Sequence, residues 1–379
     1  MIDSPFIQKI RDINAVIERD ATDTTYKYAL LRGLAEICQR YNHFKEEEEG
    51  RIFFPTGLLV ERWLLYYYPI IANPEFIPQK GGEKPLEYKK NNISFRKYFK
   101  KITQYYRDKG GFSVFYNDYR KENIPEEIQV DLKLLSRNIL FAIKQYPMRH
   151  LGYSLNHREY SIIKPEKGNS ITNEITPRYL IENCGRFSID SELYEVFRLF
   201  GAYFSGRQSI VTKWAEFTVN ADKKKPLNIE TAYRLLNETP STDRDVIEAR
   251  RFYESLLIKL GSLECIWSGK RITKSNELEL DHMIPFSIYM NNDLWNLMPT
   301  HKIINAKKGD QIPSESILLR RKEIIQNYWK ILEDEYPERF QNETRISLTG
   351  TSKVDAFIRV TQISQFLVKN QGYSDWDLH

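Results

Sequence analysis

Residues 278–286 read LELDHMIPF, and residues 296–309 read NLMPTHKIINAKKG. Apolar residues alternate along the first stretch, so a strand would place four of them on one face: Leu278, Leu280, Ile284 and Phe286. Pro285 has no amide hydrogen to donate, so strand pairing should fail near it, and Asp281 and His282 should lie close to a strand end. Because regular pleating points neighbouring side chains to opposite faces, the backbone must bend there if these two residues share a site.

The wider segment 263–313 is expected to form two strands, a loop and a short helix, and its polar residues resemble the pattern of the HNH endonuclease family. The core of that family is a ββα-metal motif. The family pattern has Asp-His at the end of the second strand, Asn-Leu in the following loop, and Asn or His on the helix with Lys three residues later. This sequence has a matching residue at each of those positions: Asp281, His282, Asn296, Asn305 and Lys308. Several matches in register are more specific than a lone Asp-His pair.

The chemistry of phosphodiester hydrolysis explains these residue types. The reaction needs an activated water and a cation that stabilises the negative transition state and the leaving oxygen. His282 is the candidate general base, because a neutral imidazole can accept a proton near neutral pH. Asp281 and Asn305 offer the hard oxygen ligands that Mg²⁺ or Mn²⁺ prefers. The resemblance implies that Asn296 positions the loop and the His282 ring, and that Lys308 supports the phosphate or the helix end.

Structural zinc is not expected, although many HNH proteins bind it with two Cys pairs. Only Cys265 stands at the corresponding positions here, where Ser268, His301 and Ile304 replace the other cysteines. One thiolate and one imidazole cannot complete a tetrahedral zinc site. Apolar side chains are expected to pack in its place: Ile266, Trp267, Leu297 and Ile304. His301 lies one turn before Asn305, so it either faces the active site or occupies a helix start at the surface.

A second candidate surface is the basic stretch 89–109, which holds eight Lys or Arg residues and one acidic residue, Asp108. Three of the lysines are predicted to contact nucleic-acid phosphates: Lys97, Lys100 and Lys101. Aromatic residues are interleaved with them and could stack on exposed bases. The alternative is an amphipathic helix with a solvated basic face and an aromatic face in the core.

Composition narrows the class of protein. The chain has 379 residues and a net charge of +5, and 13% of its residues are aromatic, which argues against a disordered protein. Its apolar stretches are too short to cross a bilayer and no signal peptide is visible, so no membrane association is expected. Three widely spaced cysteines favour a reducing compartment, which we take to be the cytoplasm.

The expected fold is α+β and predominantly helical, with a large helical N-terminal region and a small ββα-metal HNH domain embedded near the C-terminal third. Four parts are expected: a helical domain at 1–147, a mixed α/β region at 148–240, the HNH domain at 241–320 and a helical segment at 321–379. Apolar periodicity and capping signals predict helices at 25–41, 58–71, 94–109, 125–140, 191–204, 242–260, 314–333 and 353–369. Short strands are expected near 160–163, and the glutamate run 46–49 is expected to be an exposed loop or helix end.

The resemblance implies a metal-dependent endonuclease that acts on nucleic acid, with DNA as the expected substrate and RNA as the alternative. By analogy, a large helical region joined to an HNH unit implies a role in bacterial restriction or anti-phage defence. Two alternatives stay open. The chain could be a nuclease subunit gated by a partner protein or a nucleotide signal, or assembled into a defence complex. It could also be a catalytically silent nucleic-acid-binding module. The sequence contains no phosphate-binding P-loop, dinucleotide fingerprint or serine-hydrolase elbow.

Overall fold

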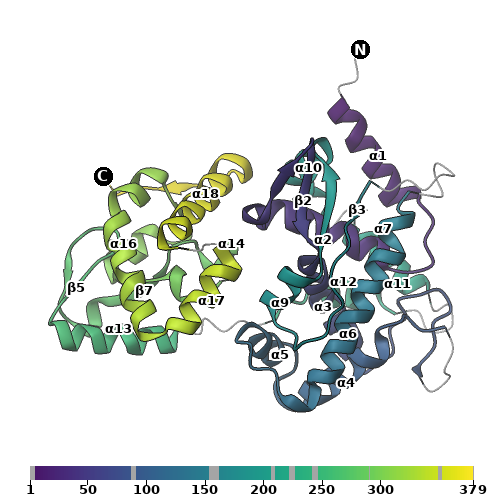
Figure 1. Ribbon diagram of the computed structural model, residues 1–379, viewed down its shortest axis with the longest axis horizontal. Helices are drawn as coiled ribbons and strands as arrows, with labels where there is room; N and C mark the ends of the chain where they lie inside the picture. Colours follow the sequence, from purple (N-terminus) through teal and green to yellow (C-terminus); the bar gives the residue numbers. More distant parts are fainter. Residues whose placement is uncertain are drawn as a thin grey trace. The chain divides into compact units, whose positions relative to one another are not determined.

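The computed structural model of the chain describes residues 5–86, 91–152, 162–205, 210–221, 227–240, 246–289, 291–348 and 352–378. The chain forms two compact units, Met1–Ser241 and Thr242–His379 (Figure 1). The predicted fold class, predominantly helical α+β, is confirmed, because both units consist mainly of helices with small sheets. In the described residues, no helix is long and apolar enough to cross a membrane.

The N-terminal unit combines many helices with one small sheet. Its helices are α1 (Pro5–Arg19), α2 (Tyr26–Arg40), α3 (Thr56–Ala72), α4 (Arg96–Arg107), α5 (Gly111–Arg120), α6 (Glu126–Gln145), α7 (Pro147–His150), α9 (Pro177–Asn183), α10 (Ser191–Ser205), α11 (Ile210–Asn220) and α12 (Ile229–Leu236). Its strands are β1 (Glu46–Glu48), β2 (Arg51–Pro55), β3 (Lys164–Pro165) and β4 (Arg186–Asp190).

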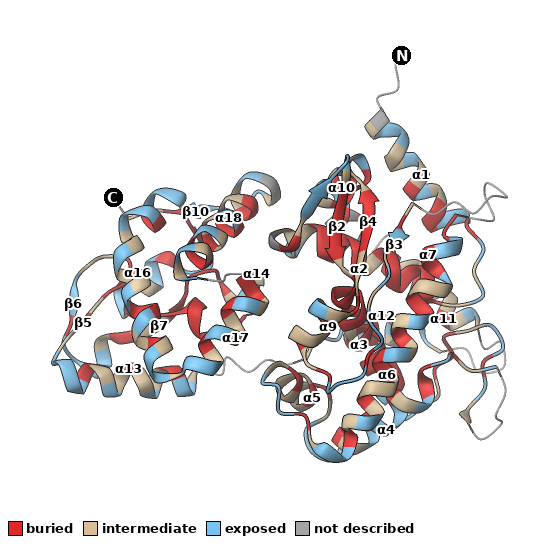
Figure 2. Ribbon diagram, in the orientation of Figure 1, coloured by how far each residue is buried: buried red, intermediate tan, exposed pale blue. Residues whose placement is uncertain are grey.

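Helix α3 forms the centre of this unit. Nearly every residue from Thr56 to Ile71 is buried, and a helix that is apolar on all sides belongs in a core (Figure 2). Helices α2, α4, α6, α9 and α12 pack against it. At Gly57 a Cβ atom would lie 2.1 Å from the Leu180 carbonyl oxygen, so only glycine lets α9 approach the start of α3 this closely.

The sheet of the N-terminal unit is antiparallel, in the order β1-β2-β4-β3. The prediction of a loop or helix end at Glu46–Glu49 is wrong, because Glu46–Glu48 form the exposed edge strand β1. Arg186 of β4 compensates the acidic edge, with guanidinium nitrogens 2.5 Å from Glu46, 2.8 Å from Glu48 and 2.9 Å from Glu166. Of the strand predicted near 160–163, residues 160 and 161 lie outside the described residues, and strand β3 begins only at Lys164.

The C-terminal unit also mixes helices with short paired strands. Its elements are α13 (Ile247–Leu260), β5 (Leu263–Glu264), β6 (Arg271–Ile272), β7 (Leu278–His282), α14 (Phe286–Tyr289), β8 (Leu297–His301), α15 (Lys302–Lys308), β9 (Ile312–Pro313), α16 (Glu315–Glu335), α17 (Pro337–Leu348), α18 (Lys353–Gln371) and β10 (Asp375–Trp376). The tail therefore has three helices where the sequence predicts two.

The tail shares one hydrophobic core with the segment 263–313. Strand β10 pairs in parallel with β9, so the end of the chain returns to that segment. The indole nitrogen of Trp329 in α16 donates a hydrogen bond of 2.8 Å to the Trp295 carbonyl. The predicted HNH domain at 241–320 and the predicted helical segment at 321–379 thus lie in one compact unit of the structure.

Candidate active site

Strands β7 and β8 and helix α15 form a consecutive ββα unit. The strands are antiparallel, with Asp281 opposite Met298 and His282 opposite Leu297. Asp281 and His282 therefore lie at the end of the first strand of this ββα unit. The second strand of the unit is β8, at a place where the sequence predicts a loop. Helix α15 begins directly after β8 and packs against both strands.

The end of β7 is fixed by Asn296, which has no exposed surface. Its side-chain oxygen accepts the Ile284 amide hydrogen at 2.8 Å, and its side-chain nitrogen donates to the carbonyls of Ile284 at 3.0 Å and Asn291 at 3.1 Å. The strand thus ends at His282, and Ile284 and Phe286 do not continue it as predicted. The geometry suits the loop-positioning role expected for Asn296.

The His282 ring is held by a residue that the sequence did not reveal. Its Nε2 lies 2.8 Å from the Asn292 side-chain oxygen, and the Phe286 ring packs at 5.3 Å between centroids. This contact suits the tautomer with the proton on Nε2, in which Nδ1 is the proton-accepting nitrogen of the neutral ring. The only signal for Asn292 is its place in the loop between His282 and Asn296, next to another asparagine.

Asp281 is buried and accepts two charged or polar donors. The Trp267 indole donates to its Oδ2 at 2.5 Å, and the Lys308 ammonium lies 3.1 Å from its Oδ1. Burial raises the pKa of Asp281, while Lys308 and Trp267 oppose that shift. The sequence predicts Trp267 as packing alone, so its hydrogen bond to Asp281 is an additional finding.

Lys308 is directed inward. Its side chain has no exposed surface, and its ammonium also donates to the His282 carbonyl at 3.0 Å. It therefore joins α15 to the end of β7 through Asp281 and His282. This geometry favours the supporting role over the phosphate contact that the sequence predicts for Lys308.

Asn305 and His301 lie at different positions on α15. Asn305 is half-buried, and its side chain has no hydrogen-bond partner in the part of the chain that the structure describes. His301 is the N-cap of α15, where its Nδ1 accepts the Ile303 amide hydrogen at 3.3 Å. His301 therefore occupies the helix start, which is one of the two positions considered for it.

The donor set fits a hard divalent cation. A carboxylate offers about four lone-pair positions, and Trp267, Lys308 and the His282 amide use three of those on Asp281. The Asn305 amide oxygen would add a neutral ligand, and Mg²⁺ typically keeps several waters besides one or two protein oxygens. Among the described residues no three His, Cys, Asp or Glu side chains form a metal-binding group.

Cys265 is part of the packing beneath the ββα unit. It is fully buried, and its Sγ accepts the His301 amide hydrogen at 3.3 Å. The apolar residues expected at this place are all buried in the same core: Ile266, Trp267, Leu297 and Ile304. The absence of structural zinc stays a prediction.

The predicted phosphate-binding lysines lie on α4, in the N-terminal unit. Lys97, Lys100 and Lys101 are exposed, and Lys101 pairs with Asp131 at 2.8 Å. Arg96 is instead buried against Glu83, so it adds no charge to this surface. Three interleaved aromatic residues lie in the core and cannot stack on bases: Phe95, Phe99 and Tyr106. Lys89 and Lys90 lie outside the described residues.

Comparison with known families agrees with the division into two units. Residues 265–314 match a family model described as HNH endonuclease, so the C-terminal unit carries a nuclease domain of the class that acts on nucleic acid. Residues 7–236 match a family model described as domain of unknown function (DUF8808), and this match covers more than half of the 379 residues. The chain belongs to that family. No curated protein and no solved structure matches the chain.

Proposed function

We propose that this protein is a metal-dependent HNH endonuclease that hydrolyses phosphodiester bonds, with DNA as its substrate. The observation that carries the proposal is the placement of His282, with its ring held by Asn292, beside Asp281 at the end of β7. This arrangement lies inside the segment that matches the HNH endonuclease model.

His282 acts as the general base in this proposal. Its Nδ1 accepts a proton from water as the water oxygen attacks phosphorus, and the bond from phosphorus to the leaving ester oxygen breaks. Asn292 keeps the proton on Nε2, so that Nδ1 stays the accepting nitrogen. Asn296 holds the loop that carries Asn292.

Asp281 and Asn305 would hold Mg²⁺ or Mn²⁺ through their oxygens. Such a cation supplies charge stabilisation for the transition state and the leaving oxygen. Lys308 keeps the Asp281 carboxylate oriented and lowers the cost of its burial. Trp267 fixes the other carboxylate oxygen.

A cleavage assay on the full chain tests this function. Supercoiled plasmid, linear duplex DNA, single-stranded DNA and RNA are each incubated with Mg²⁺, Mn²⁺, Ca²⁺ or chelator. We expect cleavage of DNA with Mg²⁺ or Mn²⁺ and none with chelator. Cleavage that resists chelation would contradict the metal requirement. Binding without cleavage under every condition would support the silent binding module instead.

A role in bacterial restriction or anti-phage defence is the biological context we infer for this nuclease. Its support is analogy with other chains that join a helical region to an HNH unit, and the three cysteines, all buried and unpaired as thiols, suit the cytoplasm. Expression in a bacterial host should lower phage plating efficiency, and the inactive His282→Ala variant should not. A host in which both proteins give equal plating would contradict this role.

A further inference from the structure

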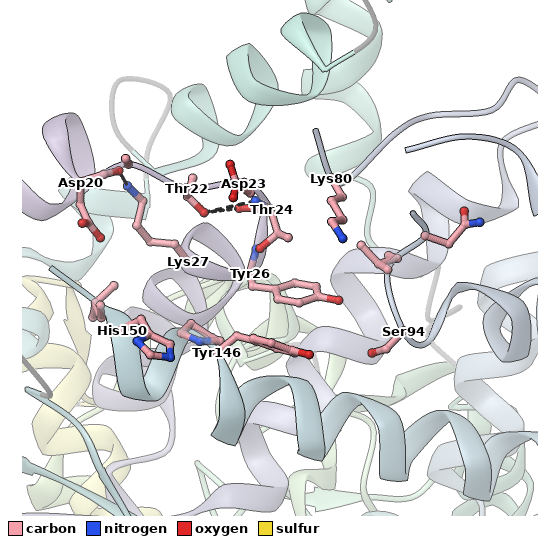
Figure 3. Close-up of a pocket in the computed structure, with 15 residues that line it drawn as sticks. Asp20, Thr22, Asp23, Thr24, Tyr26, Lys27, Lys80, Ser94, Tyr146 and His150 are labelled. Carbon is pink, nitrogen blue, oxygen red and sulfur yellow. Dashed lines mark hydrogen bonds between the residues drawn. The ribbon is translucent and has the colours of Figure 1, made fainter. Parts of the chain in front are cut away.

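A cavity of about 400 Å³ lies in the N-terminal unit, within the size range of small-molecule sites (Figure 3). The segment 20–24 and the start of α2 form one side. Residues 92–94 and the junction of α6 with α7 form the others. No function described so far uses this cavity.

Two tyrosines form an aromatic wall of the cavity (Figure 3). The rings of Tyr26 and Tyr146 lie 5.8 Å apart between centroids with 35° between their planes. Tyr26 is buried, whereas Tyr146 is 47% exposed and contacts Phe141, which is 54% exposed. Exposed aromatic rings beside a cavity offer a stacking surface for a planar heterocycle.

A buried ammonium group also lines the cavity. Lys27 is only 4% exposed, and its Nζ donates to the main-chain carbonyls of Val16 at 3.1 Å and of Asp20. Among the described residues no carboxylate oxygen lies within 4.0 Å of Lys27 Nζ, and burial lowers its pKa to about 8. The negative charges of Asp20 and Glu18 oppose that shift, and the carboxylates of Asp20 and Asp23 line the cavity together with Lys27. Lys80 and His150 add basic groups to the lining.

Hydroxyl and carboxylate groups complete the lining. Thr22, Thr24 and Ser94 supply hydroxyls. Asp20 accepts the Gly152 amide hydrogen at 2.9 Å and is a hydrogen-bond acceptor on the cavity wall. Acceptors of this kind suit the hydroxyls of a sugar or the amino group of a base better than a phosphate.

We propose that this cavity binds a nucleotide, with its base against the wall formed by Tyr26 and Tyr146 and its phosphate toward Lys80, which lies across Tyr26 from Lys27 (Figure 3). The site lies in a different unit from the ββα unit, so it goes beyond the endonuclease activity. Two sources share this chemistry: a free mononucleotide, or a nucleotide turned out of a nucleic-acid strand.

The test is isothermal titration calorimetry on the full chain in chelator, which prevents cleavage from affecting the result. The probes are the common ribo- and deoxyribonucleoside monophosphates, adenosine, inorganic phosphate and a short single-stranded oligonucleotide. Tyr146→Leu removes one ring of the aromatic wall, and Lys80→Ala removes one positive charge from the lining. Lys84→Ala removes an exposed lysine nearby that does not line the cavity and is the matched control.

We expect one mononucleotide to bind at one per chain and more tightly than adenosine or phosphate alone. Its affinity should fall roughly tenfold or more in Tyr146→Leu and in Lys80→Ala, and stay unchanged in Lys84→Ala. If the oligonucleotide alone binds, with the same dependence on these variants, the nucleotide comes from a strand. The proposal is overturned if neither probe binds, or if binding is equal in wild type and both cavity variants. That outcome would not change the result of the cleavage assay. The nucleotide-binding proposal and the endonuclease proposal can therefore be contradicted independently.

Discussion

The Asn292 side chain contacts Nε2 of His282, the proposed base, and favours the tautomer in which Nδ1 accepts a proton. The contact of 2.8 Å to Nε2 ties the tautomer of the base to one loop residue. General-base catalysis contributes typically about 10²–10⁴-fold, and a ring with the wrong tautomer loses much of it.

Replacing Asn292 should therefore lower the rate of cleavage without removing nucleic-acid binding. We expect Asn292→Ala to reduce kcat roughly tenfold or more. Asn292→Asp retains an oxygen acceptor and should keep more of the rate. Single-turnover cleavage and a binding assay in chelator measure the two effects. Equal rates for the alanine and aspartate variants would contradict the orienting role.

Lys308 should stabilise the ββα unit through its buried contact with Asp281. Breaking a buried ion pair by removing one partner typically costs about 3–5 kcal/mol, because the other charge stays buried without compensation. Lys308→Met should therefore increase hydrogen exchange in peptides from β7 to α15. Lys307→Met, at the exposed neighbouring position, is the control and should behave like wild type. Similar exchange in both variants would show that the pair is not stabilising.

The elements that sequence patterns predict best are the long helices with continuous apolar faces. The predictions of α2, α3, α6 and α10 are confirmed within a few residues, because burial against one core gives them a clear period. The ββα residues were found for a different reason: chemistry constrains their type and spacing.

The missed elements depend on contacts between distant parts of the chain. Strand β1 is acidic and exposed, and it pairs with β2. The residue that compensates its negative charge, Arg186, lies 140 residues further along the chain. Helix α17 has a weak apolar pattern and is separated from α16 only by Tyr336 and the start at Pro337. Asn292 has only its place in the loop as a sequence signal, because its contact with His282 depends on how the loop folds around Asn296.

Helix α17 also supports that loop. Glu343 accepts the Leu294 amide hydrogen at 2.6 Å, and Ser347 contacts Asp293. Burial, with the nearby Asp293 charge, raises the pKa of Glu343 to about 7, whereas Arg339 lowers it. The element beneath the active-site loop therefore carries a group that titrates near neutral pH.

The stability of the C-terminal unit should depend on Glu343 and pH. Its folded-state pKa of about 7 lies above the unfolded value near 4.5, so between these pH values the folded state holds a proton that the unfolded state has lost. Its contribution is thus complete below pH 4.5 and falls by on the order of 3 kcal/mol as pH rises from 4.5 through 7. Denaturant unfolding at pH 5 and pH 8 should show a smaller fall for Glu343→Gln than for wild type. Glu338→Gln, at an exposed site on α17, should retain the wild-type fall; equal falls in all three proteins would contradict the assignment.

On the scale of the whole molecule, the two units have separate cores and separate candidate sites. The match to the domain of unknown function covers residues 7–236, nearly all of the N-terminal unit, whereas the HNH match covers only the centre of the C-terminal one. The candidate sites of the two units can therefore be tested with separate substitutions.

Neutralising Lys97, Lys100 and Lys101 together should weaken nucleic-acid binding and flatten its salt dependence. Each lost phosphate contact should lower the slope of log affinity against log salt by about one unit. Because Lys101 pairs with Asp131, we expect Lys97 and Lys100 to carry most of the effect. Titrations at several salt concentrations measure the slope. An unchanged slope would show that α4 has only a solvated basic face.

The most direct measurement of the central claim compares two histidines of the ββα unit in one cleavage assay. His282 is the proposed base, whereas His301 caps α15 and serves as the matched control. With Mg²⁺, we expect His282→Ala to lose about 10²-fold or more in rate while it still binds DNA in chelator. His301→Ala should keep nearly the wild-type rate, with a stability loss of about 0.5–2 kcal/mol from the missing cap. Wild-type cleavage by a His282→Ala protein of verified mass would contradict the account.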